Sequence, residues 1–239
     1  MHGFANPARF LRIARVLTAP FLVAGLALTA GALVYGLVYA PAERLQGDTV
    51  RILFIHVPAA WLGMAGWSAI AAASFVEIVW RHPLAGIAAR ASAAPGAFFA
   101  ALCLASGSLW GRPAWGTWWV WDGRLTSMLV LLFLYFGYMA LAGASSREGG
   151  ASRIVAIFGL VGAINIPIIH YSVIWWNSLH QAPSIGMGGS AMAGPFLIGL
   201  LVATIGFTLI FAGVVLARMR ALLAEIQAEA RLRRKAFEG

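Results

Sequence analysis

Six long runs of apolar residues divide the chain and set its architecture. They cover residues 21–40, 52–80, 91–109, 127–144, 154–174 and 195–217. A helix of about 20 residues crosses a hydrocarbon core of roughly 30 Å, and these runs lack the alternation of barrel strands. The pattern therefore predicts an all-α integral membrane protein. We expect one six-transmembrane-helix bundle over residues 1–217, followed by a basic tail over 218–239.

Composition and charge orient the bundle in the membrane. Hydrophobic residues make up 61% of the chain and charged residues only 10%, which excludes an ordinary soluble domain. Thirteen of the 17 basic residues precede the first run, flank the second and fourth connections or follow the last run. The alternate connections hold only Arg44, Arg51, Arg112 and Arg124. We therefore expect both termini in the cytoplasm and the odd-numbered connections in the periplasm. This distribution indicates that the basic residues behind the net charge of +9 face membrane lipid and do not bind nucleic acid.

The third connection, residues 110–126, is rich in tryptophan. Four indoles stand within seven residues, ahead of an acidic and a basic residue: Trp115, Trp118, Trp119, Trp121, Asp122 and Arg124. Two interpretations stay open, a belt that anchors the connection in the lipid headgroups or a platform for a flat apolar ligand. Asp122 either caps the next helix or pairs with Arg124. The outward arginines contact either ligand carboxylates or lipid headgroups.

Two histidines fall on the predicted outer side. His56 lies about one turn into the second helix, and His180 follows the fifth. A single histidine near a helix end is more often a hydrogen-bonded packing residue than a ligand. Neutral imidazole does bind haem iron, however, and two imidazoles can fill both axial positions, so a ligand pair and two packing residues both stay open here. His170 is the alternative ligand. It or Asn165 can instead satisfy backbone groups that Pro167 frees in the fifth helix.

Three segments together resemble a known family. The run Trp115-Gly116-Thr117-Trp118-Trp119-Val120-Trp121-Asp122-Gly123-Arg124-Leu125-Thr126 resembles the WWD signature of the haem-handling proteins of cytochrome c maturation. Segments 55–61 (IHVPAAW) and 175–181 (WWNSLHQ) extend the resemblance to the CcmC family of haem exporter proteins, over about residues 10–220. Ser178 stands where that family usually carries Thr, and it keeps the hydroxyl group.

This resemblance implies a site and a set of partners. It implies haem b on the periplasmic face, with His56 and His180 as axial ligands of the iron. The side chains implied around the porphyrin are Trp115, Trp118, Trp119, Trp121, Asp122 and Arg124. The resemblance also implies delivery of haem to a periplasmic chaperone, CcmE, within a complex that holds CcmD and the CcmA–CcmB ABC transporter of the bacterial inner membrane.

The remaining chemistry limits the function classes. Cys103 is the only cysteine and no Cys-x-x-Cys-His motif exists, so the chain is not itself a c-type cytochrome. No hydrolytic or redox constellation is visible in the sequence, and we expect a haem-binding and transfer protein and not an enzyme. Two alternative functions stay open, a membrane cytochrome b and a haem permease. A membrane cytochrome b usually pairs its histidines inside the bilayer, whereas a haem permease needs polar groups along the path of the haem.

Overall fold

The computed structural model describes residues 6–147, 153–176, 178–180, 184–186 and 188–238. The helices are α1 (Pro7–Val34), continued by a π-helical turn (Tyr35–Tyr39), α2 (Leu53–Trp80), preceded by a 3-10 turn (Asp48–Ile52), α3 (Ala85–Trp115), α4 (Gly123–Arg147), α5 (Arg153–Gly162), α6 (Asn165–Trp175) and α7 (Gly194–Glu238). Two short strands, β1 (Ile185–Gly186) and β2 (Gly189–Ser190), pair as an antiparallel hairpin. Within the described residues six helical segments are long and apolar enough to cross a membrane, with α5 and α6 forming one of them. The predicted all-α six-helix class is confirmed.

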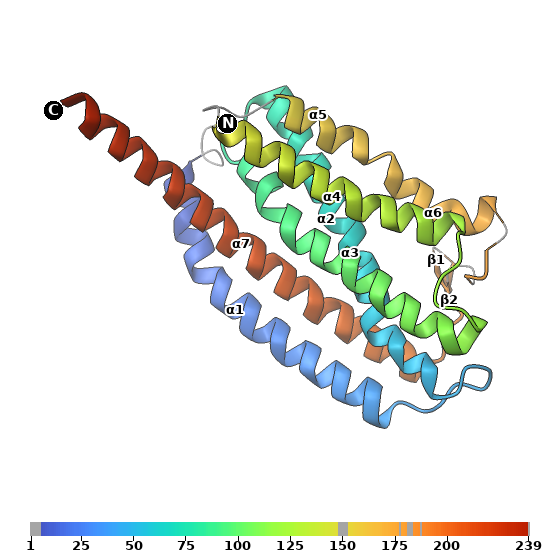
Figure 1. Ribbon diagram of the computed structural model, residues 1–239. Helices are drawn as coiled ribbons and strands as arrows, with labels where there is room; N and C mark the ends of the chain where they lie inside the picture. Colours follow the sequence, from blue (N-terminus) through green and yellow to red (C-terminus); the bar gives the residue numbers. More distant parts are fainter. Residues whose placement is uncertain (1–5, 148–152, 177, 181–183, 187, 239) are drawn as a thin grey trace.

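The helices pack around a central antiparallel pair, α2 and α3 (Figure 1). Helices α1 and α7 pack together on one side of this pair, and α4, α5 and α6 cover the other. The start of α1 and the end of α7 lie at one end of the bundle, which we call the terminal end. The loops at 40–47 and 116–122 and the β1–β2 hairpin lie at the opposite end, which we call the loop end. The three segments that resemble the haem-handling family therefore meet at the loop end.

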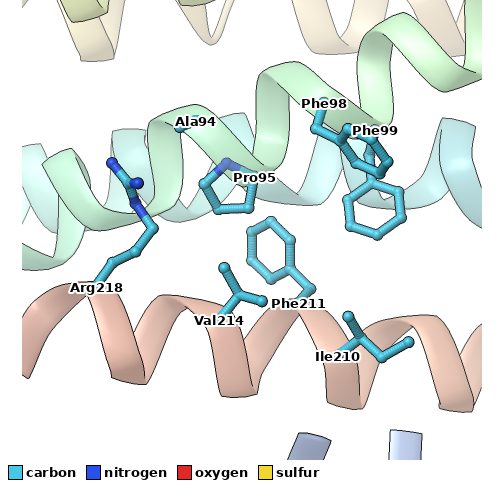
Figure 2. Close-up of a pocket in the computed structure, with 8 residues that line it drawn as sticks. All are labelled: Ala94, Pro95, Phe98, Phe99, Ile210, Phe211, Val214 and Arg218. Atoms are coloured by element: carbon cyan, nitrogen blue, oxygen red, sulfur yellow. The ribbon is translucent and has the colours of Figure 1, made fainter. Parts of the chain in front are cut away.

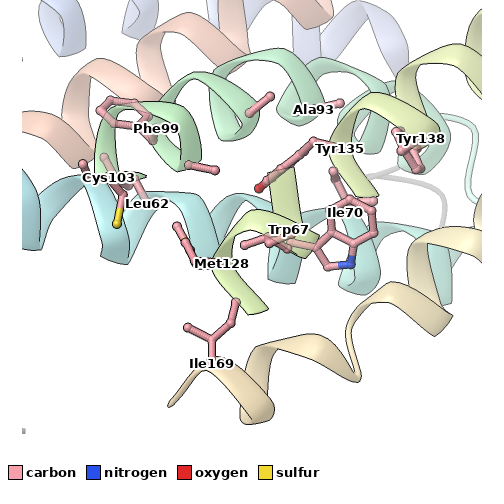
Figure 3. Close-up of a cluster of buried hydrophobic side chains, with 14 of the residues drawn as sticks. Leu62, Trp67, Ile70, Ala93, Phe99, Cys103, Met128, Tyr135, Tyr138 and Ile169 are labelled. Carbon is pink, nitrogen blue, oxygen red and sulfur yellow. The ribbon is translucent and has the colours of Figure 1, made fainter. Parts of the chain in front are cut away.

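The core between α2, α3, α4 and α5 is built around Trp67, whose side chain is fully buried (Figure 3). The Tyr135 ring packs edge-on against it, with 5.0 Å between ring centroids. Trp67 donates its Nε1–H to the carbonyl of Gly159 at 3.1 Å, and Tyr135 donates its hydroxyl to the carbonyl of Gly63 at 2.7 Å. Because both buried donors find backbone acceptors, these large rings contribute their full apolar burial. The core is a rigid frame for the loop end.

A groove lies between α3 and α7, and Figure 2 shows the side chains that line it. Pro95 has no N–H, so the carbonyl of Ala91, four residues earlier, loses its helical donor. Arg218 donates its Nε–H to this carbonyl at 3.0 Å. The rest of the lining is apolar, with Phe98 and Phe211 on opposite helices. Arg218, which the sequence assigned to the basic tail, therefore helps to join two helices of the bundle.

Helices α1, α3 and α7 extend furthest beyond the apolar runs that predicted them. Helix α1 starts directly after Asn6, whose Oδ1 accepts two N–H groups of the first turn at 2.9 and 3.4 Å. Helix α3 continues to Trp115 and ends at Gly116, where φ is +79°. Helix α7 continues over 218–238, since that segment is rich in Ala, Leu, Glu and Arg, which favour helix. The tryptophan-rich third connection is thus shorter than the predicted 110–126, and the basic tail from residue 218 is an extension of α7.

The fifth apolar run is broken into α5 and α6 just before Asn165. Pro167 lies in the first turn of α6, where a missing N–H costs little. The carbonyl of Ala163 accepts instead the N–H of Ile166 at 3.1 Å. Asn165 donates its side-chain amide to the carbonyl of Ser127 in α4 at 2.8 Å. The interpretation that Asn165 serves a group freed by Pro167 is therefore wrong, because Asn165 ties α6 to α4.

Candidate functional site

His56 lies in the first turn of α2 and is held against α3. Its Nδ1 is 3.1 Å from the carbonyl oxygen of Cys103 and 3.1 Å from Oγ of Ser106. A carbonyl oxygen only accepts hydrogen bonds, so Nδ1 carries the proton and donates it. In a neutral imidazole this leaves the lone pair of Nε2 free. His56 is therefore prepared to bind a metal through Nε2.

Helix α3 is shaped to receive the His56 ring. A Cβ at Gly107 would stand 2.9 Å from Cε1 of His56, so only glycine allows this approach. The Trp110 ring packs edge-on against the imidazole, with 5.7 Å between centroids. Trp110 in turn donates its Nε1–H to the side-chain carbonyl of Gln46 at 3.0 Å. The loop at 40–47 therefore holds the Trp110 ring in place, and Trp110 in turn packs on His56.

His180 lies after α6 and is held in a similar protonation state. Its ring packs against Trp115 with 4.7 Å between centroids, and its Nδ1 is 3.3 Å from Oδ2 of Asp122. An ionised carboxylate only accepts, so Nδ1 again donates and Nε2 is free. Burial of the imidazolium outweighs the attraction of Asp122, and the pKa of His180 lies below its ordinary value. The ring is therefore neutral at pH 7.

Both histidines pack against the loop-end part of α3, His56 directly and His180 through the Trp115 ring. His56 contacts Gly107, as described above. The Trp115 ring, on which His180 packs, folds back over Gly111, where a Cβ would stand 3.1 Å from its Cε3 atom. Four residues correspond to about 6 Å along a helix. His56 also lies within electrostatic range of His180. The structure thus brings the two predicted ligands together.

Asp122 joins the start of α4 to the His180 segment. Its Oδ1 accepts the N–H of Leu125 at 2.8 Å, as expected for a helix cap. Its Oδ2 accepts the hydroxyl of Ser178, whose oxygen accepts the N–H of His180 at 3.1 Å. Burial opposes the ionisation of Asp122. The hydrogen bonds from Ser178, Leu125 and His180 outweigh burial, and the pKa of this carboxyl lies below its ordinary value.

Of the two roles left open for Asp122, the structure shows the cap. The other role, an ion pair with Arg124, does not form within the described part of the chain. There Asp48 pairs with Arg51, and Asp122 accepts a hydrogen bond from the neutral ring of His180. The partner of the carboxylate is a histidine more than 50 residues away in the sequence.

The tryptophans of the motif occupy three environments. Trp115 closes α3 beneath His180. Trp118 and Trp121 expose 54% and 75% of their side chains. Trp119 is half-buried and lies 5.4 Å from Trp121 between ring centroids, and its Nε1–H is buried without a partner among the described residues. The loop therefore presents two open indole faces and one unused donor.

Three outward arginines bond backbone carbonyl groups of the loop end. The pairs are Arg51 with Leu37, Arg112 with Gly116, and Arg124 with His170. Arg124 lies within electrostatic range of both His56 and His180. It is the arginine placed to compensate negative charge beside the histidines.

The other described histidines have different contacts. His82 lies at the terminal end, where its Nδ1 accepts the N–H of Leu84 at 3.2 Å, which puts its proton on Nε2. His170, the alternative ligand, is exposed, and its ring packs edge-on against Tyr171 at 4.8 Å. Among the described histidines, the geometry favours His56 and His180 as the pair.

Several supporting residues were missed by sequence reasoning. Trp110 packs on His56 and bonds Gln46, which is 64 residues from Trp110 in the sequence, and the carbonyl of Cys103 fixes the tautomer of His56. The spacing of Cys103, Gly107 and Gly111 by four residues was a usable signal, because small residues at that interval leave one face of a helix open. No local pattern marks Gln46.

Comparison with known proteins identifies the family. A family model described as CcmC, heme exporter protein C, matches residues 1–234. Heme exporter protein C of Bradyrhizobium diazoefficiens is 52% identical over 218 residues, which cover 90% of this chain and 82% of that protein. The Escherichia coli K12 protein of the same name is 42% identical over 226 residues, 93% of this chain and 90% of its own length. That of Haemophilus influenzae is 39% identical over 221 residues, 92% and 90% of the two chains. The chain belongs to the heme exporter protein C family.

Proposed function

We propose that this chain binds haem b at the loop end and passes it on during the maturation of c-type cytochromes. One observation carries the proposal. Both imidazoles have Nδ1 bound to an acceptor, which leaves both Nε2 atoms free at the loop end. Haem iron takes neutral imidazole nitrogen at both axial positions. His56 and His180 are the axial ligands, and the family name supports haem as the cargo.

The surroundings suit a flat, apolar and partly anionic cargo. The exposed rings of Trp118 and Trp121 offer faces for stacking on the porphyrin edge. The Nε1–H of Trp119, which has no partner among the described residues, can donate to a bound group. The positive charge of Arg124 compensates the negative charge of the haem propionates. Iron–nitrogen bonds of about 2 Å need the two Nε2 atoms about 4 Å apart. His56 and His180 therefore hold their Nε2 atoms at this separation when haem is bound.

The exposed indole edge is also where the cargo leaves. We place CcmE, a periplasmic haem chaperone, at Trp118 and Trp121, and we place the chain in an inner-membrane complex with CcmD and the CcmA–CcmB ABC transporter. The role is binding and transfer and not catalysis. Such a role needs haem held tightly enough to be positioned and loosely enough to be released.

The uneven placement of basic residues supports a periplasmic loop end. Leu45 exposes 90% of its side chain at this end, Ala228 is exposed on the extension of α7, and the native Cys103 is buried. A membrane-impermeant thiol reagent added to intact cells should label Leu45→Cys and not Ala228→Cys. The reverse labelling would place the site in the cytoplasm and contradict delivery to a periplasmic chaperone.

Haem transfer between purified proteins tests the proposed function. The detergent-solubilised chain should purify with six-coordinate, low-spin haem and lose it to added haem-free chaperone. Two other outcomes would contradict the proposal. Haem that cycles with quinol and stays on the chain indicates a membrane cytochrome b. Haem that enters sealed vesicles containing only this chain indicates a permease.

A further inference from the structure

The two proposed ligands differ in the group that binds Nδ1. His56 donates to the uncharged carbonyl of Cys103, whereas His180 donates to the carboxylate of Asp122. A carboxylate polarises the imidazole N–H more strongly than a carbonyl does, and it shifts electron density toward Nε2. The donor strength of Nε2 toward a metal rises with that shift. Two chemically identical side chains therefore present unequal donors.

Asp122 is held firmly in place for this task. The side chain is 8% exposed, and its two oxygens have separate partners. Oδ1 accepts the N–H of Leu125 and caps α4, while Oδ2 faces Ser178 and His180. Because the cap and the histidine contact use different oxygens, a substitution can keep one and remove the other.

We propose that Asp122 is a positioning residue that acts on the bound iron through His180. Its carboxylate fixes the tautomer and orientation of His180 and makes His180 the stronger of the two axial donors, which favours ferric over ferrous haem. This inference rests on the proposed haem site. The negative charge of the Asp122–His180 pair stabilises the higher charge of ferric iron, and hydrogen bonding to an axial ligand is one of the ways in which a protein sets the potential of haem.

The test is the reduction potential and ferric haem affinity of Asp122→Asn. Asparagine caps a helix about as well as aspartate, so α4 keeps its start. Its amide either accepts weakly from His180 or faces Nδ1 with a donor, and both arrangements weaken Nε2. We expect ferric haem affinity to fall by about 10–100-fold, the usual cost of losing such a partner. The midpoint potential should rise by about 59 mV for each tenfold by which ferric affinity falls more than ferrous affinity.

Two further variants make the result specific. Asp122→Ser also caps a helix but is too short to reach His180, and it should shift the potential in the same direction. Asp48→Asn is the matched control. It removes a carboxylate of the loop end that forms an ion pair with Arg51 at 3.0 Å, and it should leave the potential unchanged.

The outcomes separate this inference from the function on which it rests. Wild-type protein that binds haem without a bis-imidazole spectrum would contradict the proposed site itself. A bis-imidazole wild type whose potential and ferric affinity stay the same in both Asp122 variants would contradict the role of Asp122 alone. A shift of equal size in Asp48→Asn would show a general charge effect and also overturn the inference.

Discussion

His56 and His180 carry the same side chain in two different kinds of structure. His56 stands on a helix and packs against another helix. Its Nδ1–H donates to a backbone carbonyl, and its ring lies against Gly107. His180 stands on a segment after α6, and its described contacts are the side chains of Asp122 and Trp115 and the hydroxyl of Ser178. One half of the site is fixed by the packing of the bundle, and the other half depends on side chains alone. We infer that helix packing holds the His56 half in place, whereas the position of the His180 half depends on Asp122, Trp115 and Ser178.

Removing both histidines is the strongest way to test this division. His56→Ala together with His180→Ala should abolish haem in the purified protein, because no described side chain replaces either Nε2. The pyridine haemochrome assay measures the loss. His170→Ala is the matched control and should keep its haem, since its ring is exposed. A double variant with an unchanged six-coordinate spectrum would promote His170 to ligand.

Filling the space under His56 should weaken the fixed half. The Cβ of Gly107→Ala would stand 2.9 Å from Cε1 of the ring, so the imidazole must move. Overpacking costs about 1–3 kcal/mol, and we expect haem affinity to fall about tenfold. Titration of the haem-free protein with ferric haem measures the change. Gly31→Ala, where the new Cβ meets nothing within 4 Å, should bind haem as the wild type does. Equal affinity in the two variants would mean that His56 is not held as described.

Removing the open indoles should affect transfer while the iron ligands stay in place. Trp118→Ala with Trp121→Ala should weaken haem binding by about 1 kcal/mol, or roughly fivefold, and slow transfer to the chaperone. The low-spin spectrum should keep its band positions, because neither ring bonds Nδ1 of a histidine. Leu45→Ala, also exposed at the loop end, is the control. If only the amount of protein in the membrane falls, the two indoles are a lipid belt.

We expect the smallest effect on stability and haem binding from a change at Trp110, whose ring packs on His56. Trp110→Phe keeps an aromatic ring beside the imidazole but loses the hydrogen bond to Gln46. The free energy of unfolding should fall by about 0.5–1.5 kcal/mol, and haem content should not change. Thermal unfolding in detergent measures the first quantity and absorbance the second. A loss of haem in Trp110→Phe would mean that the loop at 40–47 controls the site directly.

Apolar length and charge predicted most of this architecture from the sequence. The six apolar runs and the shared side of His56 and His180 follow from the bilayer and from the placement of arginine. The ends of the helices did not follow, because Asn6 and Gly116 act through cap and turn geometry. The role of Asp122 stayed open because its histidine partner is distant in the chain. Tertiary packing decides such contacts, and no local pattern records them.

The most direct test of the account is to count the histidine nitrogens bound to the haem iron. Protein grown with ¹⁵N-histidine and loaded with ferric haem can be examined by pulsed electron paramagnetic resonance. The account predicts two strongly coupled ¹⁵N nuclei in the wild type, and one in either His56→Ala or His180→Ala supplied with unlabelled imidazole. Two coupled ¹⁵N nuclei remaining in either variant, or fewer than two in the wild type, would contradict ligation by this pair.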